Sequence, residues 1–453
     1  MKLSRHSRTL KQRLQRCDFR LVEAVLKVAR TVEQHPANPF GRPPRAFLVG
    51  GLVRDLALGQ YTGLDADIEI YGVQPEILEA MFRPVFPEAT ISTVGKAFGI
   101  IKILLEGGIS LDIALPRTES KEGEGHRGFR IIGDPNLEPE TAARRRDFTI
   151  NAISLDPLTG ALIDPLHGLF DLEEGLLRVA DKATFGDDPL RALRAVQLVG
   201  RFHLRVEAET AEIIRNMIQT PDFRTLSIER ITDEWKKLFL KAPYPSYGLQ
   251  FAADMGLTDF PVVLAADTCA HLAEKQGLKN EERLISMLAL ILESRPSTEI
   301  SSLFERMLFG SNVEQGVLRV QEALQTMHRI QATPNVLRQF LRDLLPVDCR
   351  TFFVTAIASG HLRPARAQSW QRLIEEHDLI QQAQTTLLRG QDLIDLGLAM
   401  GPHIGLWISH IESLRDQGLI ETREQALQTL TELLAVCPTP PQNNPNKSTK
   451  EKS

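Results

Sequence analysis

Alternation of apolar and polar positions predicts strands in the first part of the chain. In 65-DADIEIYG-72, Asp65, Asp67 and Glu69 fall on one face and Ala66, Ile68 and Ile70 on the other, the pattern of a strand with one buried face. A short helix is expected over 52–58, directly after a glycine pair. Further strands are expected at 46–51, 98–105, 109–115 and 161–165. The chain up to residue 170 therefore mixes strands and helices.

The spacing of apolar positions becomes helical after Asp171 and stays so to about residue 436. The run 284-LISMLALIL-292 is bounded by charged residues and is too short to cross a membrane, so it predicts a buried helix. Further helices are expected over 366–388 and 406–434. The polar, Pro-rich residues 437–453 are expected to be disordered. The pattern as a whole predicts an α+β head followed by an all-helical remainder.

Composition limits the class of protein without naming it. A length of 453 residues is too great for one core and predicts two to four domains. Hydrophobic and charged contents of 43% and 25% are ordinary for a globular protein, and the net charge of −5 argues against a uniformly basic surface but leaves room for a local basic stripe. Four widely spaced cysteines, without a CxxC motif, predict reduced thiols in the cytoplasm and no zinc site.

The amino terminus is basic, has no acid before Asp18 and lacks the apolar stretch of a secretory signal. It is either a targeting peptide or, as we favour, a basic surface helix that leads into 19–34 and a Pro-rich linker over 35–45.

The polar segment 117–129 contains several glycines and is expected to be a mobile loop.

A strand that ends in Gly50-Gly51 and turns into a helix allows backbone N–H groups to approach an anion closely. Arg54, one turn into that helix, could hold a phosphate oxygen. A plain tight turn explains the glycine pair equally well when it is considered alone.

Asp65 and Asp67 leave the same face of their strand, where two carboxylates repel each other unless a cation joins them. Hard oxygen ligands beside a phosphate turn suit Mg²⁺, with Asp112 as a candidate third ligand from a neighbouring strand. The competing explanation is the solvated face of an edge strand. Glu69 is expected either to join this face or to be solvated.

Two further motifs combine charged side chains in ways that local structure does not fully explain. In 144-RRRDFTINA-152, Arg145 and Arg146 could hold a triphosphate or ribose and Asn151 a sugar hydroxyl, although a basic strand edge would look the same. In 184-TFGDDPLRALRAVQLVGRF-202, Asp188 and the following proline are typical of a helix start. Capping leaves Arg191 and Arg194 unexplained.

The order GGLVRD, DAD, RRDFTINA, DDPLRALR and 226-LSIERITDEWKKL-238 resembles the class II tRNA nucleotidyltransferases, the CCA-adding enzymes, and their bacterial poly(A) polymerase relatives. The resemblance runs from about residue 46 to residue 240. It implies a polymerase-β-like nucleotidyltransferase head (a mixed sheet with helices), followed by an all-helical neck, body and tail. The implied domains are an N-terminal basic helix and linker (1–45), head (46–170), neck (171–245), body without an HD phosphohydrolase site (246–365), tail (366–436) and disordered end (437–453).

The resemblance also implies a reaction and roles for the singled-out residues. The 3′-hydroxyl of a tRNA would attack the α-phosphate of CTP or ATP and release pyrophosphate, with two Mg²⁺ held by Asp65 and Asp67. Phosphates and sugar would be held by Gly51, Arg54, Arg146 and Asn151. The 184–202 helix would read the base, because Asp188 can accept from the exocyclic amine and Arg191 can donate to the ring nitrogen that cytosine and adenine share. Arg194 would also reach the nucleotide.

Several alternatives stay open at this stage. Gln197 replaces an arginine that many members carry, which removes one candidate phosphate or base contact. The basic positions in 226–243 fit an amphipathic packing helix or a phosphate-facing stripe. The expected function is CCA addition in the cytoplasm, on the tRNA acceptor arm and 3′ end, with no membrane partner; protein partners are not indicated. The rivals are a poly(A) polymerase, a partial enzyme that adds only CC or only A, and an inactive RNA-binding homologue.

Overall fold

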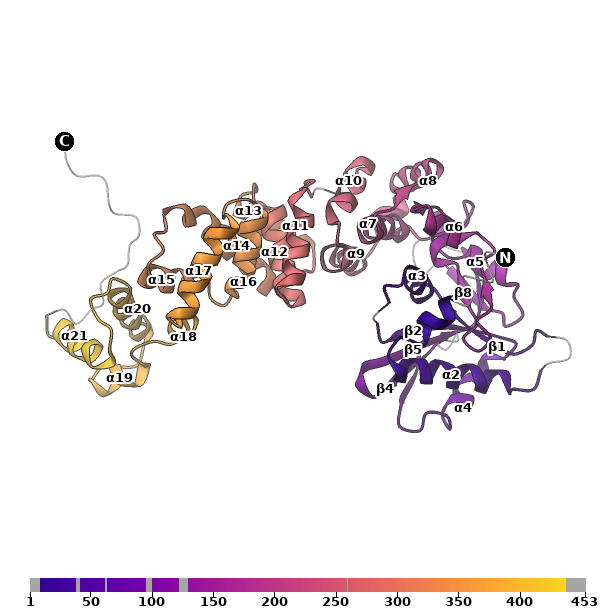
Figure 1. Ribbon diagram of the computed structural model, residues 1–453, viewed down its shortest axis with the longest axis horizontal. Helices are drawn as coiled ribbons and strands as arrows, with labels where there is room; N and C mark the ends of the chain where they lie inside the picture. The colour runs from indigo at the N-terminus through magenta and orange to yellow at the C-terminus, as the bar shows by residue number, and fades with distance from the viewer. Residues whose placement is uncertain are drawn as a thin grey trace. The chain divides into compact units, whose positions relative to one another are not determined.

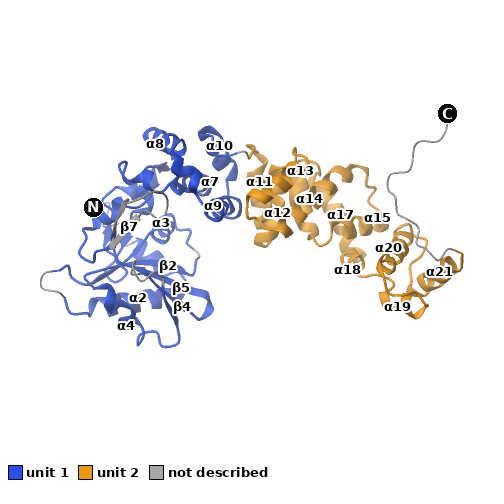
Figure 2. Ribbon diagram, turned by 180° about the vertical axis from the view of Figure 1, so that it is seen from behind, with its two compact units in different colours: residues 1–259 blue, residues 260–453 orange. Residues whose placement is uncertain are grey.

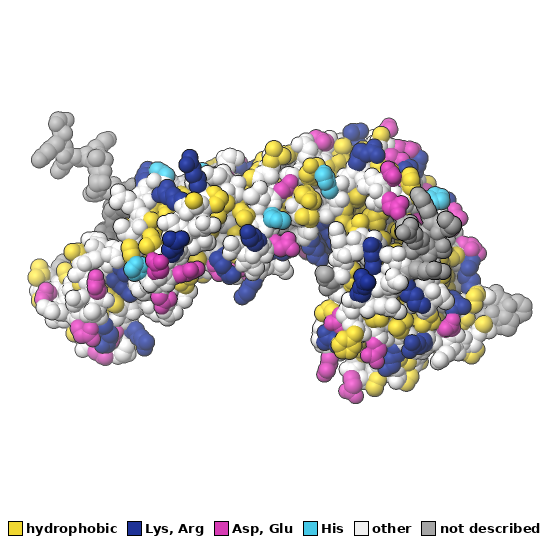
Figure 3. Space-filling model, viewed as in Figure 1, with side chains coloured by type: hydrophobic (Ala, Val, Ile, Leu, Met, Phe, Trp, Pro, Cys, Tyr) yellow, Lys and Arg dark blue, Asp and Glu magenta, His cyan; other side chains and the backbone are white. Residues whose placement is uncertain are grey.

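A computed structural model describes residues 9–37, 41–61, 63–94, 100–121, 129–258 and 260–436. The chain divides into two units, residues 1–259 and 260–453 (Figure 2). Acidic and basic side chains are interspersed over the visible face of both units, which agrees with the small net charge (Figure 3).

A seven-stranded mixed sheet organises the first unit, in the order β3-β4-β5-β2-β1-β8-β9. Neighbouring strands are antiparallel except for β2 and β5, which run parallel with Asp67 opposite Asp112. The predicted strands are confirmed, and 90-TISTV-94 is an additional edge strand that lacks a clear alternation of apolar residues. The strands are β1 (Arg45–Val49), β2 (Asp65–Tyr71), β3 (Thr90–Val94), β4 (Ile100–Leu105), β5 (Ile109–Ala114), β8 (Ser154–Leu155) and β9 (Leu162–Ile163).

The apolar face of β2 packs against helices α2 (Phe19–Glu33) and α4 (Pro75–Phe82), which lie together on one side of the sheet (Figure 1). Leu10 and Leu14 are buried in the same core, so the described part of the amino-terminal segment belongs to the head and covers its sheet. The opposite face of β2 carries Asp65, Asp67 and Glu69. Burial of one face thus leaves the acidic face for the site.

The segment 117–129 differs from the expected loop. Strands β6 (Arg117–Lys121) and β7 (Phe129–Gly133) pair antiparallel along their whole length, so the prediction of a loop is wrong for residues 117–121 and 129. Backbone pairing explains the difference, because the ladder of hydrogen bonds between β6 and β7 does not depend on an alternating apolar pattern in 117–121. Residues 122–128, the middle of the predicted loop, lie outside the described residues.

Helices complete the first unit after the sheet. The central helix α7 (Leu190–Phe202) packs against α9 (Ile228–Lys241) and α10 (Pro245–Met255), as Figure 1 shows. Gly200 and Gly248 permit this packing, since a Cβ atom at either position would lie 2.6 or 2.5 Å from the Leu238 side chain. Smaller elements are α3 (Gly51–Leu58), α5 (Pro139–Arg144), α6 (Gly168–Glu173), α8 (Ala208–Ile218) and the two-residue parallel pair β10 (Leu176–Leu177) and β11 (Arg205–Val206).

In the second unit every described element is a helix. The apolar run at 284–292 forms the buried helix α12, as predicted. The helices expected over 366–388 and 406–434 are each divided, near Asp378, which has a φ of 48°, and near Gly418, which has a φ of 72°. Backbone turns at these two positions override an otherwise continuous helical pattern. The helices are α11 (Ala265–Lys275), α12 (Asn280–Ile291), α13 (Ser297–Arg306), α14 (Ser311–Thr326), α15 (Pro334–Leu344), α16 (Cys349–Ala358), α17 (Pro364–Glu376), α18 (Leu379–Gln384), α19 (Gly390–Asp395), α20 (Pro402–Asp416) and α21 (Arg423–Val436).

Candidate active site

One pocket of about 550 Å³ in the first unit collects the predicted site residues from α3, β2, α7 and the segment that follows α5. Of the described residues, nine basic and four acidic side chains line it, so the pocket is locally positive in a chain of net charge −5. Such a concentration of positive charge favours a polyanionic ligand. The lining residues are Gly50, Gly51, Arg54, Asp65, Asp67, Arg117, Arg145, Arg146, Asp147, Asn151, Asp188, Arg191, Arg194, Gln197, Leu198, Arg201, Lys237 and Lys241.

Asp65 and Asp67 stand side by side on the polar face of β2, at the end nearest the glycine turn. Burial raises the pKa of Asp67, and the carboxylates of Asp112 and Asp65 raise it further against the opposing charge of Arg146. Asp112 forms an ion pair with Lys102, with Nζ and Oδ1 3.1 Å apart, and does not line the pocket.

The residues present fit a divalent cation. Two carboxylates side by side repel each other unless a cation lies between them, and their oxygens suffice for Mg²⁺ when substrate phosphates and water complete its shell. No group of three or more acidic, histidine or cysteine side chains with metal-site geometry occurs among the described residues. The sheet therefore supplies only part of a metal-binding site, and the oxygens of a triphosphate would supply further ligands.

Asp67→Asn should raise the melting temperature of the metal-free protein at pH 8 by a few degrees. The pKa of Asp67 is raised on folding, so its stabilising effect is present at low pH and is lost as the pH rises through the folded pKa. Asparagine carries no charge, so the variant does not lose stability as the pH rises. At pH 4 its melting temperature should therefore equal that of the wild type. Thermal melts at both pH values check this; addition of Mg²⁺ should stabilise the wild type more than the variant, and equal stabilisation of both would contradict the assignment.

The glycine turn brings backbone and charged groups unusually close together. Gly50 has a φ of 71°, and a Cβ atom there would lie 3.3 Å from Asp67 Oδ2 and 3.4 Å from Arg146 Nη1. The absence of a side chain leaves room between an acid of the predicted metal pair and an arginine of the predicted phosphate group. Both the positive φ and the close approach of these two side chains therefore favour glycine at position 50.

Arg54 is buried and held from three sides. Its guanidinium pairs with Asp55 (2.7 Å), donates to Asn151 Oδ1 (2.6 Å) and lies over the ring of Phe202 at 4.3 Å. Asn151 in turn donates to Asp147 (3.0 Å). Both polar groups of Asn151 are therefore engaged within the protein, and its contacts support a role in positioning Arg54.

Asp147 is a central acid of the pocket that sequence reasoning did not assign. It is 5% exposed and pairs with Arg194 at 3.0 Å besides accepting from Asn151. Burial opposes its ionisation, but the charge of Arg194 and the hydrogen bond from Asn151 hold the pKa of Asp147 below its usual value. Through Asp147 and Asn151, Arg194 and Arg54 belong to one network of hydrogen bonds and ion pairs.

Glu69 lies on the face of β2 that carries Asp65 and Asp67, as predicted, but it is not solvated. It is 3% exposed and accepts from Arg145 (2.8 Å), Arg146 (3.4 Å) and Tyr71 (2.9 Å). Burial alone would raise the pKa of Glu69, yet the charges of Arg146 and Arg145 hold it below its usual value. Glu69 therefore fixes the two arginines rather than a metal.

Glu69→Ala should destabilise the protein by about 3–5 kcal/mol, because it takes a buried carboxylate away from two partly buried guanidinium groups. Glu69→Gln keeps the shape and an acceptor oxygen, and should destabilise less. Urea denaturation measures both. An alanine variant as stable as the wild type would show that the arginines do not depend on this carboxylate.

The start of α7 places Asp188 and Arg191 in the pocket with protein partners already in place. Both Asp188 oxygens lie 3.2 Å from Arg230, and one accepts from the backbone N–H of Leu190 at 3.2 Å. Arg191 donates to the carbonyl oxygens of Arg145 (2.8 Å) and Thr184 (3.2 Å). Helix α7 begins at Leu190, one residue after the proline expected at its first position. These contacts hold both side chains in one orientation. Each side chain keeps further hydrogen-bonding capacity, Asp188 as an acceptor and Arg191 as a donor.

The other end of α7 adds residues that the sequence did not single out as site residues. Gln197 is 5% exposed, and its Oε1 has no hydrogen-bond partner among the described residues. Arg201 continues the helical spacing of Arg191 and Arg194, and Lys237 and Lys241, one turn apart on α9, join it in the pocket lining. Of the two interpretations of 226–243, these positions support the phosphate-facing one, although α9 also buries Trp235 and Leu238.

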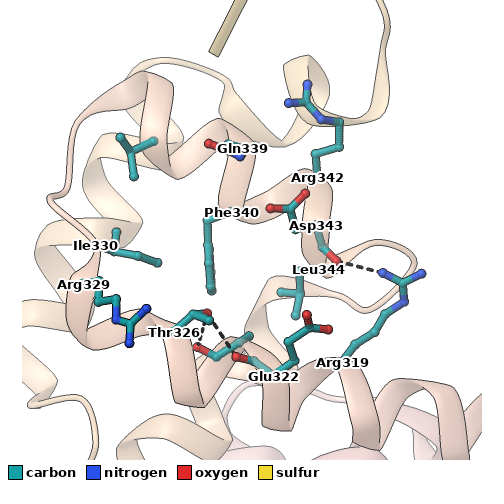
Figure 4. A pocket seen from close by; sticks show the side chains of 12 residues that line it. Arg319, Glu322, Thr326, Arg329, Ile330, Gln339, Phe340, Arg342, Asp343 and Leu344 are labelled. Atoms are coloured by element: carbon teal, nitrogen blue, oxygen red, sulfur yellow. Dashed lines mark hydrogen bonds between the residues drawn. The ribbon is translucent and has the colours of Figure 1, made fainter. Parts of the chain in front are cut away.

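A second pocket, of about 620 Å³, lies between α14 and α15 in the second unit (Figure 4). The ring of Phe340 stands in it, and Arg319 donates to the carbonyl oxygen of Asp343 at 2.9 Å. None of the motifs contributes to this pocket, so the candidate active site is the pocket of the first unit.

Comparison with known proteins agrees with this placement. Residues 46–178 match the family described as the poly A polymerase head domain. A multifunctional CCA protein of Xylella fastidiosa (strain M23) is 38% identical over 204 residues, which cover 44% of this chain and 45% of that protein. The matched part is thus about half the length of this curated relative.

Solved structures resemble the fold over more of the chain. A CCA-adding enzyme in complex with CTP matches with a TM-score of 0.61 and 24% identity, covering 87% of this chain and 92% of that one. A Thermotoga maritima CCA-adding enzyme complexed with tRNA matches with a TM-score of 0.57 and 23% identity, covering 86% and 91%.

The sheet, the acidic pair and the glycine turn define a nucleotidyltransferase head, and the helical remainder confirms the predicted fold class. The head, residues 46–178, is thus a member of the poly A polymerase head domain family, and this part of the chain is similar to multifunctional CCA proteins. The resemblance drawn from five short motifs is confirmed. No described helix is both long enough and apolar enough to span a bilayer.

Proposed function

We propose that the protein is a template-independent RNA nucleotidyltransferase that adds C and A to the 3′ end of tRNA from CTP and ATP. The observation that carries this is one pocket that brings together the Asp65–Asp67 carboxylate pair, several arginines and the Asp188–Arg191 edge. Related proteins of the same fold include CCA-adding enzymes in complex with CTP, ATP and tRNA, which supports these substrates. We place the reaction in the cytoplasm.

In this proposal the chain's own residues orient both reactants. Arg54 and Arg146 bind triphosphate oxygens beside the Gly50–Gly51 turn, because their guanidinium groups are fixed by Asn151 and Glu69. The 3′-hydroxyl of the RNA then meets the α-phosphate in line with the departing pyrophosphate. Preorganisation of this kind avoids reorganisation during the reaction.

Asp65 and Asp67 would hold the divalent metal that this family generally uses. We propose Mg²⁺, which when bound neutralises the triphosphate and lowers the pKa of a hydroxyl group. Asp112 is the candidate third carboxylate, because it lies opposite Asp67 in the sheet register and contributes to its raised pKa.

At the base end, Asp188 accepts from the exocyclic amine of cytosine or adenine and Arg191 donates to the adjacent ring nitrogen. Guanine and uracil present the opposite order of donor and acceptor, so both bonds would be lost. Arg194, held by Asp147, supports the same end of the nucleotide.

The test supplies tRNA transcripts that end at the discriminator base, at C or at CC, each with CTP, ATP or both. The proposed enzyme completes CCA on all three and then stops. Products that end after CC, or extension only of the CC transcript, would establish a partial enzyme, and long A tails on arbitrary RNA a poly(A) polymerase. No extension of any transcript, with RNA still bound, would favour an inactive homologue.

A further inference from the structure

Three aromatic rings meet at the surface beyond the carboxyl end of α7. The ring of His203 lies 4.0 Å from that of Tyr247 and 5.3 Å from that of Tyr244. His203 is exposed, and each tyrosine is 44% exposed. No part of the proposed nucleotide chemistry uses these rings, which we call the aromatic platform.

His203 ends helix α7 as its C-cap residue. His203 has a φ of 53°, the left-handed conformation that glycine adopts most easily at a helix end and that costs other residues roughly 1 kcal/mol. Tyr244 is anchored next to it by its N–H bond to the carbonyl oxygen of Gly200, at 3.3 Å. Strained residues that persist often serve a function, and here the strain presents an imidazole against two phenol rings.

The aromatic platform continues the pocket. Arg201, two residues before His203, and Lys241, three residues before Tyr244, both line the pocket, so the rings start within about 10 Å of its basic end. Helix α7 has 13 residues and is therefore about 20 Å long, with the base-reading residues at one end and the platform at the other. The packing of α7, α9 and α10 fixes this arrangement.

The charge at this end suits phosphates. Lys241 is exposed and makes no ion pair with the described residues, while Arg201 lies 3.7 Å from Asp55 in a loose pair. Basic groups beside exposed aromatic rings are the usual means of binding unpaired RNA, in which bases stack and phosphates track a cationic surface. A purely apolar protein partner would not need the two cations.

We propose that His203, Tyr244 and Tyr247 stack an unpaired nucleotide of the RNA substrate while Arg201 and Lys241 hold its phosphates. The platform thereby guides the 3′ end of the RNA into the pocket. This inference rests on the proposed function, because it names the path of the RNA to that same site.

The test compares wild type with Tyr244→Ala/Tyr247→Ala, measuring steady-state transfer of A to a transcript ending in CC. Loss of stacking should raise the KM for the RNA about 10- to 100-fold, with the KM for ATP and the kcat at saturating RNA within about twofold. Tyr244→Phe/Tyr247→Phe should restore the wild-type KM, because stacking needs the ring and not the hydroxyl group. Phe170→Ala, which removes another exposed ring of the same unit, is the matched control and should change nothing.

Binding measurements separate failure of this inference from failure of the proposed function. Fluorescence anisotropy with the single-stranded 3′ end of tRNA, scanned with one abasic nucleotide at a time, needs no catalysis. One abasic position should weaken binding to wild type but not to the alanine variant. Unchanged RNA affinity in a folded alanine variant, or equal losses in both proteins at every abasic position, would overturn the platform even if transfer occurs.

Discussion

Asp65→Ala and Asp67→Ala should each reduce nucleotide transfer by about 10³-fold or more, while RNA binding persists. The two carboxylates lie on the face of β2 that points away from the core, so neither substitution removes an apolar contact. Each substitution removes one of the two carboxylates that would hold a cation against the triphosphate. The loss should therefore appear in kcat with CTP and with ATP alike.

Asp112→Asn tests the candidate third ligand. Asp112 pairs with Lys102 and lies outside the pocket lining, so a small effect would limit the metal site to two carboxylates. A loss as large as that of Asp65→Ala would make Asp112 the third ligand. Transfer retained by both Asp65→Ala and Asp67→Ala would remove the basis of the metal assignment.

The sequence predicted those parts of the site that depend on local periodicity. A period of two placed Asp65 and Asp67 on one face of a strand, and a glycine pair marked the turn beside them. The same reasoning could not place Glu69, because its burial depends on Arg145 and Arg146, more than seventy residues later. A strand pattern tells which residues share a face but not what covers that face.

Asp147 and the basic end of the pocket were missed for related reasons. Asp147 stood in a motif dominated by arginines, and its partners Arg194 and Asn151 come from different elements. A signal for Arg201 was present, since it extends the helical spacing from Arg191 and Arg194. Lys237 and Lys241 share one helix face, but only the packing of α9 on α7 shows that this face adjoins the pocket.

Asp188→Ala should reduce selection between CTP and UTP more than it reduces binding of either. A site built around two hydrogen bonds to the base rejects the wrong base by on the order of 10⁴-fold, and loss of one partner should bring this ratio down to about 10- to 100-fold. Competition between CTP and UTP on a transcript ending at the discriminator base measures the ratio directly.

The structure determines which control is informative. Exchange of Asp188 and Arg191 is a poor test, because an arginine at 188 would face Arg230 and an aspartate at 191 would face two carbonyl oxygens. Asp187→Ala is better, since Asp187 is the neighbouring acid and does not line the pocket. It should leave the ratio unchanged.

Arg230→Ala distinguishes direct reading from an indirect effect. Asp188 holds Arg230 through both oxygens, so its removal also releases that arginine. If the carboxylate itself contacts the base, Arg230→Ala should lower the rate through looser positioning and still prefer CTP to UTP by about 10³-fold or more. If Arg230→Ala and Asp188→Ala lose selection equally, the arginine or its helix reads the base, and the edge assigned to α7 would have to move to α9.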